Sequence, residues 1–494
     1  MNINPISKFI KKDPKDFTKA DIVRYIEEKE VKMVQLLFVG EDGCLRKINI
    51  NVHSKSFVDQ LLTWGEMIDG SSVFPSSSRT KSTSIILLPR LSSSFVNPFE
   101  PIHTLNFLCS VHTHSGKNLE SSSEYILKKA DEAFRMVTGM EVRFKSEVEF
   151  YLYGKDDFDF SNQLQNREYT IAPYSLYDRF THEWMSKAAQ CGVLIQKGYV
   201  KGNYLKKNDH LYEQHVVELS SLSPMMAADQ LTILKWVLKN CAHQQNLKLS
   251  FAPVVDIDGK GNDLIIHSQI VKNGKNQMFS DSKLNSIGRT AIAGYLFCTP
   301  ALTAFGNSNA LSYFKVNRSL NQYHYLFWGN ERRTAPISIP QRCTQFEELY
   351  NDLNISEKPI PKKKYHTPFI THKTSDFSSE IYLLLAAHLI SVRHGFEMEE
   401  ALKFAESHYV DVDINLPEYK GKYKYLVPLP SSCFESADEL SIQRKIFEKH
   451  AVFPTDMIDN VIRNLKKVER SDWDKMIQRD HNLCIELIEK NMDC

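Results

Sequence analysis

Three features are missing from this chain of 494 residues, and each absence excludes a class of protein. The best apolar stretch, Ile381 to Val392, contains His388 and is well short of the ~20 residues that a transmembrane helix needs. The nine cysteines include no C-x-x-C pair, which argues against a disulfide framework or a zinc site. The amino terminus lacks the apolar segment of a secretory signal, so we expect a cytoplasmic protein with reduced thiols.

An excess of charge is missing as well. The chain has 61 Lys and Arg against 60 Asp and Glu, so its net charge is +1. Dedicated nucleic-acid binders rest on a basic surface, and this balance argues against that class. Hydrophobic residues make up 42% of the chain, which is typical of a folded protein with a sizeable core.

The pattern along the chain predicts two domains after a polar amino terminus. We expect residues 1–16 to be mobile and residues 17–110 to form a small β-rich domain. Two apolar runs, 31–40 and 44–50, flank an Asp-Gly turn and predict a hairpin in that domain. Residues 111–494 then form a larger domain of mixed helices and strands.

In the larger domain, apolar residues recur with helical spacing in several segments. We expect helices at 121–139, 171–190, 224–245, 284–304, 380–395 and within 436–490. Residues 247–255 and 264–271 flank the turn sequence DIDGKGND and predict a second hairpin. The stretch 341–375 is rich in Pro and Lys and is interpreted as a long surface excursion.

The strand SEVEFYLY, residues 146–153, is the first segment that indicates chemistry. Side chains alternate along a strand, so Glu147 and Glu149 share one face, roughly 7 Å apart. Two carboxylates this close need a cation, an Arg or water to neutralise them, and oxygen ligands suit Mg²⁺ or Mn²⁺. The alternative is a solvated sheet face.

Two further strands carry polar side chains. In EQHVVELS, Gln214, Val216 and Glu218 share a face, and in LIIHSQIV His267 is the candidate. A lone His on a strand is more often structural than a ligand. The segment DIDGKGND lacks the spacing of a calcium loop and is a turn signal first.

The order of these pieces resembles the glutamine synthetase family in its long bacterial form, along nearly the whole chain. The resemblance rests on these segments taken in order: VKMVQLLFVGEDG, MIDGSS, SEVEFYLY, Gln214-His215, LIIHSQ, PALTAFGNSNALSYFK, ERRTAPISIP and the tail from LPSSCFESADEL to HAVFPTDMIDNVI. It implies an α+β fold, with an amino-terminal β-grasp-like domain and a large carboxy-terminal α/β domain around an open antiparallel barrel.

The resemblance also implies a reaction and an assembly. Family members join ammonia or an amine to the γ-carboxylate of glutamate after ATP has phosphorylated it, with Mg²⁺ or Mn²⁺ holding the phosphates. Subunits form rings, and each active site lies where the large domain of one subunit meets the small domain of its neighbour. The expected partners are therefore copies of the same chain, without nucleic acid or membrane.

Carrying the family's metal ligands over leaves an incomplete set. Glu147 and Glu149 match the Glu-x-Glu pair, and Asp209 falls near the next ligand. A further family Glu falls on Val216, while Glu218 lies two residues along on the same strand face. The implied metal ligands are thus Glu147, Glu149, Asp209 and Glu218.

Other implied site positions are partly replaced. A metal-binding His falls on Ile265 and a late Glu on Thr371, whereas His267 matches a His near the nucleotide phosphates. Arg333 matches a phosphate-binding and catalytic Arg. Asp69 matches the acid that faces the neighbour's ammonium site; a structural loop cap is the alternative.

These replacements favour a divergent family member with an eroded site, inactive or impaired as a glutamine synthetase. Even changes around metal ligands typically cost ~10–100-fold in affinity or activity. An active ATP-dependent ligase that joins a different acid or amine remains the alternative. A regulatory subunit that assembles with an active relative is a third possibility.

Overall fold

The structure is a computed structural model that describes most of the chain. The described residues are 4–75, 83–155, 168–207, 209–257, 260–280, 283–318, 325–331, 334–340, 346–354, 356–358, 368–412, 414, 416–419, 423, 425–468 and 481–493. Among them, no helix is both long and apolar enough to cross a membrane.

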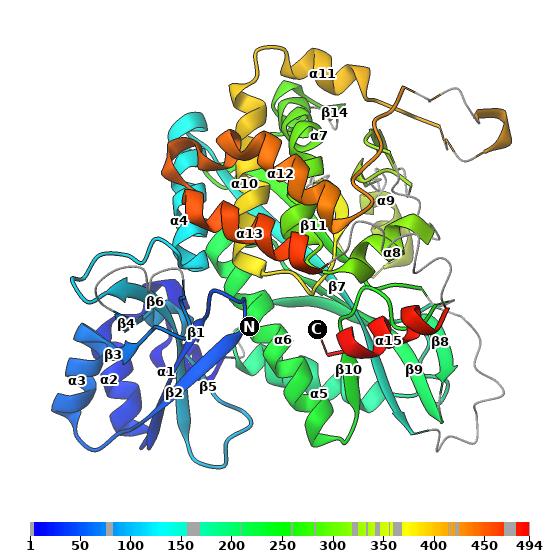
Figure 1. The fold of residues 1–494 in the computed structure, drawn as a ribbon. Coiled ribbons are helices and arrows are strands. Elements are labelled where there is room, and N and C mark those ends of the chain that lie inside the picture. The colour runs from blue at the N-terminus through cyan, green and yellow to red at the C-terminus, as the bar shows by residue number, and fades with distance from the viewer. Residues whose placement is uncertain are drawn as a thin grey trace.

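The amino-terminal domain is a sheet that packs against helices (Figure 1). Its strand order is β2-β1-β6-β4-β3, with β5 beside β6, and only β1 and β6 run parallel. The strands are β1 Met33–Val39, β2 Leu45–Asn51, β3 Glu66–Asp69, β4 Ser84–Pro89, β5 Phe95–Val96 and β6 Thr104–Thr113, and the helices are α1 Pro5–Ile10, η1 Pro14–Asp16, α2 Lys19–Glu28, α3 Lys55–Trp64 and η3 Leu91–Ser93. The predicted β-grasp-like domain and its first hairpin are confirmed.

The larger domain is built on a curled, mainly antiparallel sheet that forms an open half-barrel. Its strand order is β15-β16-β17-β11-β7-β9-β8, with β10 beside β7 and β12 beside β11. The strands are β7 Glu141–Lys155, β8 Ile195–Lys207, β9 His210–Leu219, β10 Lys248–Ser250, β11 Leu264–Lys272, β12 Lys275–Asn276, β15 Trp328–Asn330, β16 Ile337–Ile339 and β17 Ile370–Ser375. A separate small pair is β13 Phe279–Ser280 and β14 Lys283–Leu284. The predicted α+β fold class is confirmed.

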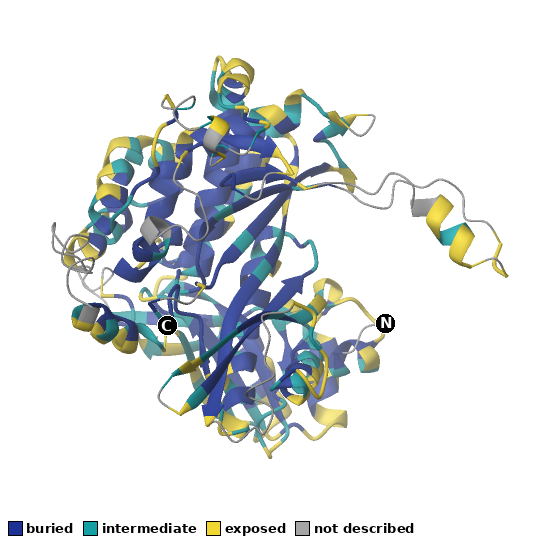
Figure 2. Cartoon of the chain, turned by 90° about the vertical axis from the view of Figure 1, so that its right-hand side faces the viewer, coloured by how far each residue is buried: buried dark blue, intermediate teal, exposed yellow. Residues whose placement is uncertain are grey.

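Several helices of the large domain pack against this sheet in one apolar core, and Figure 2 colours most residues of the sheet and of these helices as buried. The helices are α4 Ser123–Thr138, α5 Asp178–Gln190, α6 Pro224–Gln244, α7 Ser286–Gly306, α8 Ala310–Arg318, α9 Phe346–Leu353, α10 Ile381–Glu397, α11 Ala401–Ser407, η5 Pro417–Tyr419, α12 Cys433–Glu448, η6 Lys449–Ala451, α13 Thr455–Val468 and α15 His481–Asn491. Most lie close to the segments that helical periodicity predicts.

Helices α7 and α10 cross at two glycines. A Cβ atom on Gly294 would lie 2.1 Å from the carbonyl oxygen of Ser391, and one on Gly395 would lie 2.1 Å from that of Thr290. No side chain fits at such distances, so the two backbones touch directly. This backbone contact fixes the distance between α7 and α10.

The amino terminus differs from its prediction. Residues 5–10 form helix α1, in which Ile6 is fully buried against the small domain's core. Asn4 caps this helix by accepting a hydrogen bond from the backbone N–H of Ile6 at 2.9 Å. Within the segment 1–16 that we expect to be mobile, Ile6 and Ile10 thus supply an apolar face that packs against the small domain.

The second predicted hairpin is also wrong. Strands β10 and β11 do not pair with each other; both pair with β7, β10 at Tyr151–Tyr153 and β11 at Glu141–Val148. The two strands therefore follow one another along the same side of β7, and residues 251–263 connect them. Local turn signals cannot distinguish two adjacent strands from two strands that share a third.

The prediction of a surface excursion over 341–375 is wrong for its last residues, 370–375. Residues 370–375 form the buried inner strand β17, which pairs with β11 and β16. Residues 341–345, 355 and 359–367 lie outside the described part, while the outer side chain of Leu353 in α9 is 82% exposed.

A buried ion pair joins the two domains. The guanidinium of Arg90, in the small domain, donates two hydrogen bonds of 2.7 Å to the carboxylate of Asp229 on α6. Tyr382 on α10 donates its hydroxyl to the same carboxylate at 2.7 Å. The two charged side chains are 17% and 12% exposed, so removal of either partner leaves a desolvated charge.

We expect Asp229→Ala to lower the free energy of unfolding by about 3–5 kcal/mol, because it leaves the Arg90 guanidinium buried without its counter-charge. Urea unfolding followed by circular dichroism measures the change. Arg46→Ala is the control: it breaks a more exposed bidentate pair with Asp42 and should cost about 1 kcal/mol or less. Equal effects of the two variants would contradict the assigned role of the interdomain pair.

Candidate functional site

The candidate site lies on the inner face of the sheet, where strand register gathers acidic side chains. Glu147 on β7 lies directly opposite Glu218 on β9, and Glu149 lies opposite Val216. On the other side of β7, Ile265 of β11 lies opposite Glu147. Antiparallel partners in register point to the same face, so three strands contribute to one cluster.

Lysines of the same sheet neutralise this cluster. Glu218, whose side chain is 3% exposed, contacts Lys145 and also Lys197, the latter at 2.8 Å. Glu149, equally buried, contacts the ammonium group of Lys201. The positive charges that buried carboxylates require are therefore supplied by the protein itself.

His267 on β11 also belongs to this cluster. His267 contacts Glu147 through Nε2, 3.1 Å from Oε1, and Nδ1 lies 2.9 Å from Oγ1 of Thr371 on β17. The imidazole thus bridges two strands and donates to the carboxylate. Burial by itself would raise the pKa of Glu147, but the hydrogen bond and charge of His267, with the charges of Lys197 and Lys145, hold that pKa at about 2.

Glu149 is the most enclosed acid of the cluster. Besides Lys201, its carboxylate accepts hydrogen bonds from the backbone N–H of Asp263 at 3.2 Å and from Nε2 of Gln214 at 3.3 Å. Burial raises the pKa of Glu149, the Lys201 charge offsets this in part, and the nearby Asp263 carboxylate adds to the increase.

The loop that precedes β11 is tied to the same face. Lys315 on α8 lies 2.5 Å from Oδ1 of Asp263 and donates to the carbonyl of Asn262 at 2.9 Å. Gln214 donates to the carbonyl of Gly261 at 3.0 Å and to the side chain of Asn262 at 2.9 Å. A second lysine–carboxylate pair thus holds this loop against the sheet.

The site as a whole is close to electroneutral. Four carboxylates are each paired with an ammonium or imidazole group, and the residues are Glu147, Glu149, Glu218 and Asp263 with Lys145, Lys197, Lys201, Lys315 and His267. In the described ranges, no group of three or more His, Cys, Asp and Glu side chains is arranged to hold a metal ion.

The structure brings together four of the residues that the sequence singles out: Glu147, Glu149, Glu218 and His267. His372, the neighbour of Thr371, instead points to the helical layer, where Nε2 lies 3.1 Å from Oγ1 of Thr299. Burial lowers the pKa of His372 to about 3, so this ring is neutral and structural.

Asp209 does not join the cluster. It lies in the turn between β8 and β9 with a positive φ of 56°, seven positions along β9 from Val216. At ~3.3 Å per residue that is roughly 20 Å from Glu149. No contact between Asp209 and the cluster is described, so a role for Asp209 as a metal ligand stays a prediction.

Asp69 lies in the small domain, away from the cluster. Its carboxylate accepts hydrogen bonds from the backbone N–H of Ser71 at 2.9 Å and from its hydroxyl at 3.0 Å, and these bonds lower the pKa of Asp69. Within one chain it therefore caps a turn. Arg333 lies outside the described residues.

The lysines are what the sequence interpretation missed. A signal was present: Lys145 precedes Glu147 by two residues, and Lys197 and Lys201 are four apart, so each set shares a strand face. The partner strand and its register decide which acids these lysines meet. That information is not contained in the spacing.

The Glu147–His267 pair makes a pH-dependent contribution to stability. The pKa of Glu147 is about 2 when folded against an ordinary value of 4.5, so its contribution is complete above pH 4.5 and is lost as the pH falls toward 2. In that window Glu147→Gln should reduce the slope of unfolding free energy against pH by about 1.4 kcal/mol per pH unit.

Urea unfolding between pH 7 and pH 2.5 measures this slope for wild type and variant. Glu120→Gln, at a carboxylate that is 65% exposed, is the control and should leave the slope nearly unchanged. If Glu147→Gln follows the wild-type curve in parallel, the ion pair does not form in solution.

Comparison with family models matches two regions of the chain. Residues 30–114 match the model described as "Glutamine synthetase, beta-Grasp domain", and residues 121–485 match "Glutamine synthetase, catalytic domain". Both regions agree with the two domains described above.

Individual proteins are similar over nearly the whole chain. A glutamine synthetase from Frankia alni is 25% identical and covers 90% of this chain and 94% of its own length. One from Vibrio alginolyticus is 23% identical and covers 94% and 98%. At identities of 23–25%, individual site residues can differ between this chain and these relatives.

Solved structures share the fold. The cryo-EM structure of Plasmodium falciparum glutamine synthetase superposes with a TM-score of 0.71 at 19% identity, covering 92% of this chain and 98% of that one. The structure titled "Apo GmaS without ligand" gives a TM-score of 0.70 at 16% identity, covering 93% and 100%.

Proposed function

The chain belongs to the glutamine synthetase family, and we propose that it is inactive or impaired as a glutamine synthetase because its own lysines neutralise the acidic cluster. The observation that carries this proposal is the contact of Lys201 with Glu149 and of Lys145 and Lys197 with Glu218. The family generally couples ATP and divalent metal ions to carbon–nitrogen ligation.

The residues present do not fit a divalent metal centre in this arrangement. Where the family resemblance places a metal-binding Glu, His and Glu, the chain has Val216, Ile265 and Thr371. A cation that bound Glu149 or Glu218 would also have to displace ammonium groups, and hydrogen bonds to charged groups each contribute about 1.5–3 kcal/mol. We therefore derive no catalytic step through a metal.

The alternative, an active ATP-dependent ligase with a different acid or amine substrate, is favoured by one observation. Glu147, Glu149, Glu218 and His267 still lie on one face of the half-barrel. In this alternative His267 and Arg333 meet the nucleotide phosphates, and Asp69 approaches the amine site. A rearrangement of the lysines would have to accompany nucleotide binding.

We also propose that copies of the chain assemble into rings with sites at the junction of small and large domains. Asp69 is exposed and separated from the acidic cluster within one chain, so a neighbouring copy is needed to bring them together. The side chains of Trp64 and Met67, on the same edge of the small domain, are 75% and 57% exposed.

Calorimetric titration with ATP in Mg²⁺ or Mn²⁺ tests the proposal, with Glu147→Ala/Glu149→Ala as the control. We expect no saturable metal-dependent ATP binding at millimolar nucleotide, because the cluster is already neutralised. Metal-dependent binding that the double variant abolishes, followed by ADP release with an added acid and amine, would establish the alternative instead.

Removal of the lysines tests the physical reason. We expect Lys145→Ala/Lys197→Ala to bind Mn²⁺ at least about tenfold more tightly than wild type, since Glu218 then lacks both of its ammonium partners. Electron paramagnetic resonance of free Mn²⁺ measures the affinity. Lys128→Ala/Lys445→Ala removes the same charge from exposed positions outside the site and should not change it; equal gains would refute neutralisation by these lysines.

A further inference from the structure

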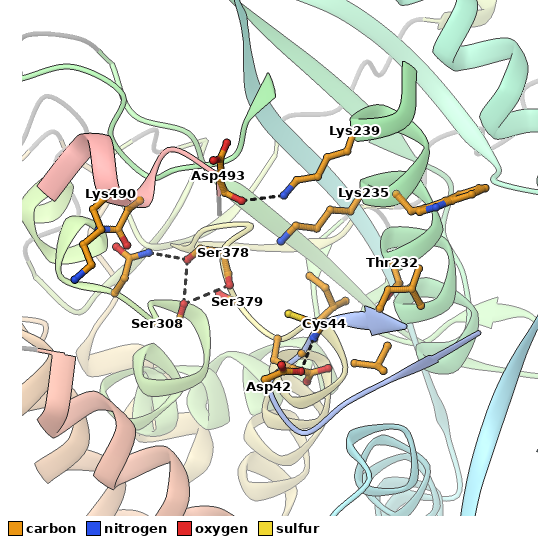
Figure 3. Close-up of a pocket in the computed structure, with 18 of the residues that line it drawn as sticks. Asp42, Cys44, Thr232, Lys235, Lys239, Ser308, Ser378, Ser379, Lys490 and Asp493 are labelled. Atoms are coloured by element: carbon orange, nitrogen blue, oxygen red, sulfur yellow. Dashed lines mark hydrogen bonds between the residues drawn. The ribbon is translucent and has the colours of Figure 1, made fainter. Parts of the chain in front are cut away.

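A large cavity lies between the two domains, away from the acidic cluster. Its volume is about 810 Å³, and it is lined by the β1–β2 turn, helix α6, the starts of α8 and α10, and the carboxy-terminal helix α15 (Figure 3). Glu147, Glu149 and Glu218 are not among its lining residues. Cavities of ~300–1,000 Å³ are the usual size of small-molecule sites.

We propose that this cavity binds a small phosphate-bearing anion, a role separate from the proposed function of the acidic cluster. The lining contains Lys235 and Lys239, one turn apart on α6, together with Lys467 of α13 and Lys490 of α15. In Figure 3 the two α6 lysines extend across the cavity toward the side that carries Ser378, Ser379 and Lys490.

Backbone carbonyl groups accept hydrogen bonds from both α6 lysines. Lys239 donates to the backbone carbonyl of Asp493 at 2.9 Å, and Lys235 donates to the carbonyl of Phe377 at 2.9 Å. A carbonyl carries no net charge, so the contact with Asp493 positions the Lys239 ammonium group without cancelling its charge. An ammonium group has three donors, which leaves Lys239 able to contact an anion as well.

Two of the three acids at the cavity wall accept hydrogen bonds from groups other than the lining lysines. Asp42 accepts two hydrogen bonds of 2.7 Å from the guanidinium of Arg46, outside the lining. Glu380 caps helix α10 by accepting the backbone N–H of Leu383 at 2.5 Å, and burial raises the pKa of Glu380 to about 7. Asp493 is the third acid of the lining, so four lysines stand against three acids and the cavity keeps a surplus of positive charge.

Hydroxyl and amide groups complete the recognition surface. Ser308 and Ser378 lie 3.1 Å apart through their Oγ atoms, and Asn309 donates to Ser378 at 3.1 Å. Asn309 and Glu380 already cap α8 and α10, and the Ser378 hydroxyl donates to Asp376, so the ammonium groups rather than helix ends would hold the ligand. A phosphate group suits this set because it offers three acceptor oxygens and nearly two charges.

Equilibrium dialysis with radiolabelled inorganic pyrophosphate in EDTA tests the proposal on the full chain. We expect saturable binding by wild type and by Glu147→Ala/Glu149→Ala, since the acidic cluster takes no part. Binding should be at least about tenfold weaker in Lys239→Glu/Lys490→Glu, because two charge-assisted contacts are lost. Lys128→Glu/Lys445→Glu makes the same charge change at exposed positions outside the cavity and should bind like wild type.

A measurement on the unaltered protein guards against misfolded variants. Cys44 lines the cavity and is exposed, whereas the other cysteines in the described residues are buried. Pyrophosphate should slow alkylation of Cys44, quantified on its peptide by mass spectrometry, by at least about threefold at saturation. No saturable binding at millimolar pyrophosphate, equal losses in both lysine variants, or unchanged alkylation of Cys44 would overturn the proposal.

Discussion

The inner face of the sheet depends on one constraint: each buried carboxylate needs a positive charge in contact with it. The ammonium group of Lys201 meets this need for Glu149. Glu149 is 2% exposed, and an ionised carboxylate at that depth is strongly disfavoured unless a positive charge meets it. The same requirement is met for Glu218 by two lysines and for Glu147 by His267. Removing Lys201 would leave Glu149 without its ammonium partner, whereas Glu218 would keep one lysine if the other were removed.

The packing of the rest of the molecule does not depend on which cation neutralises these carboxylates. The helical layer packs through the apolar face of the sheet and through the backbone contact at Gly294 and Gly395, and the domains are joined by Arg90 and Asp229. None of these contacts involves the inner face. The family fold can therefore be kept whatever neutralises the carboxylates of the inner face, which is consistent with similarity over nearly the whole chain at 23–25% identity.

Two charged regions of opposite character result. On the inner face, acids and lysines cancel within contact distance, which disfavours both metal ions and anions. In the interdomain cavity, Asp42 is held by Arg46 and Glu380 by the start of α10, so four lysines outnumber the acids of the lining. The two regions differ in where the carboxylates lie relative to the lysines, more than in the number of lysines. That placement depends on which helices and strands pack together.

The sequence by itself determined most of the helices and the position of Glu147 and Glu149 on one strand face, because apolar periodicity and strand alternation are local properties of the chain, whereas the fold class followed from its resemblance to a known family. Only the tertiary structure decided that Glu218 lies opposite Glu147, that Lys201 meets Glu149, and that Asp209 lies at the far end of β9. Strand register and domain packing bring together residues that are distant in sequence, and their counter-charges follow from that geometry rather than from spacing.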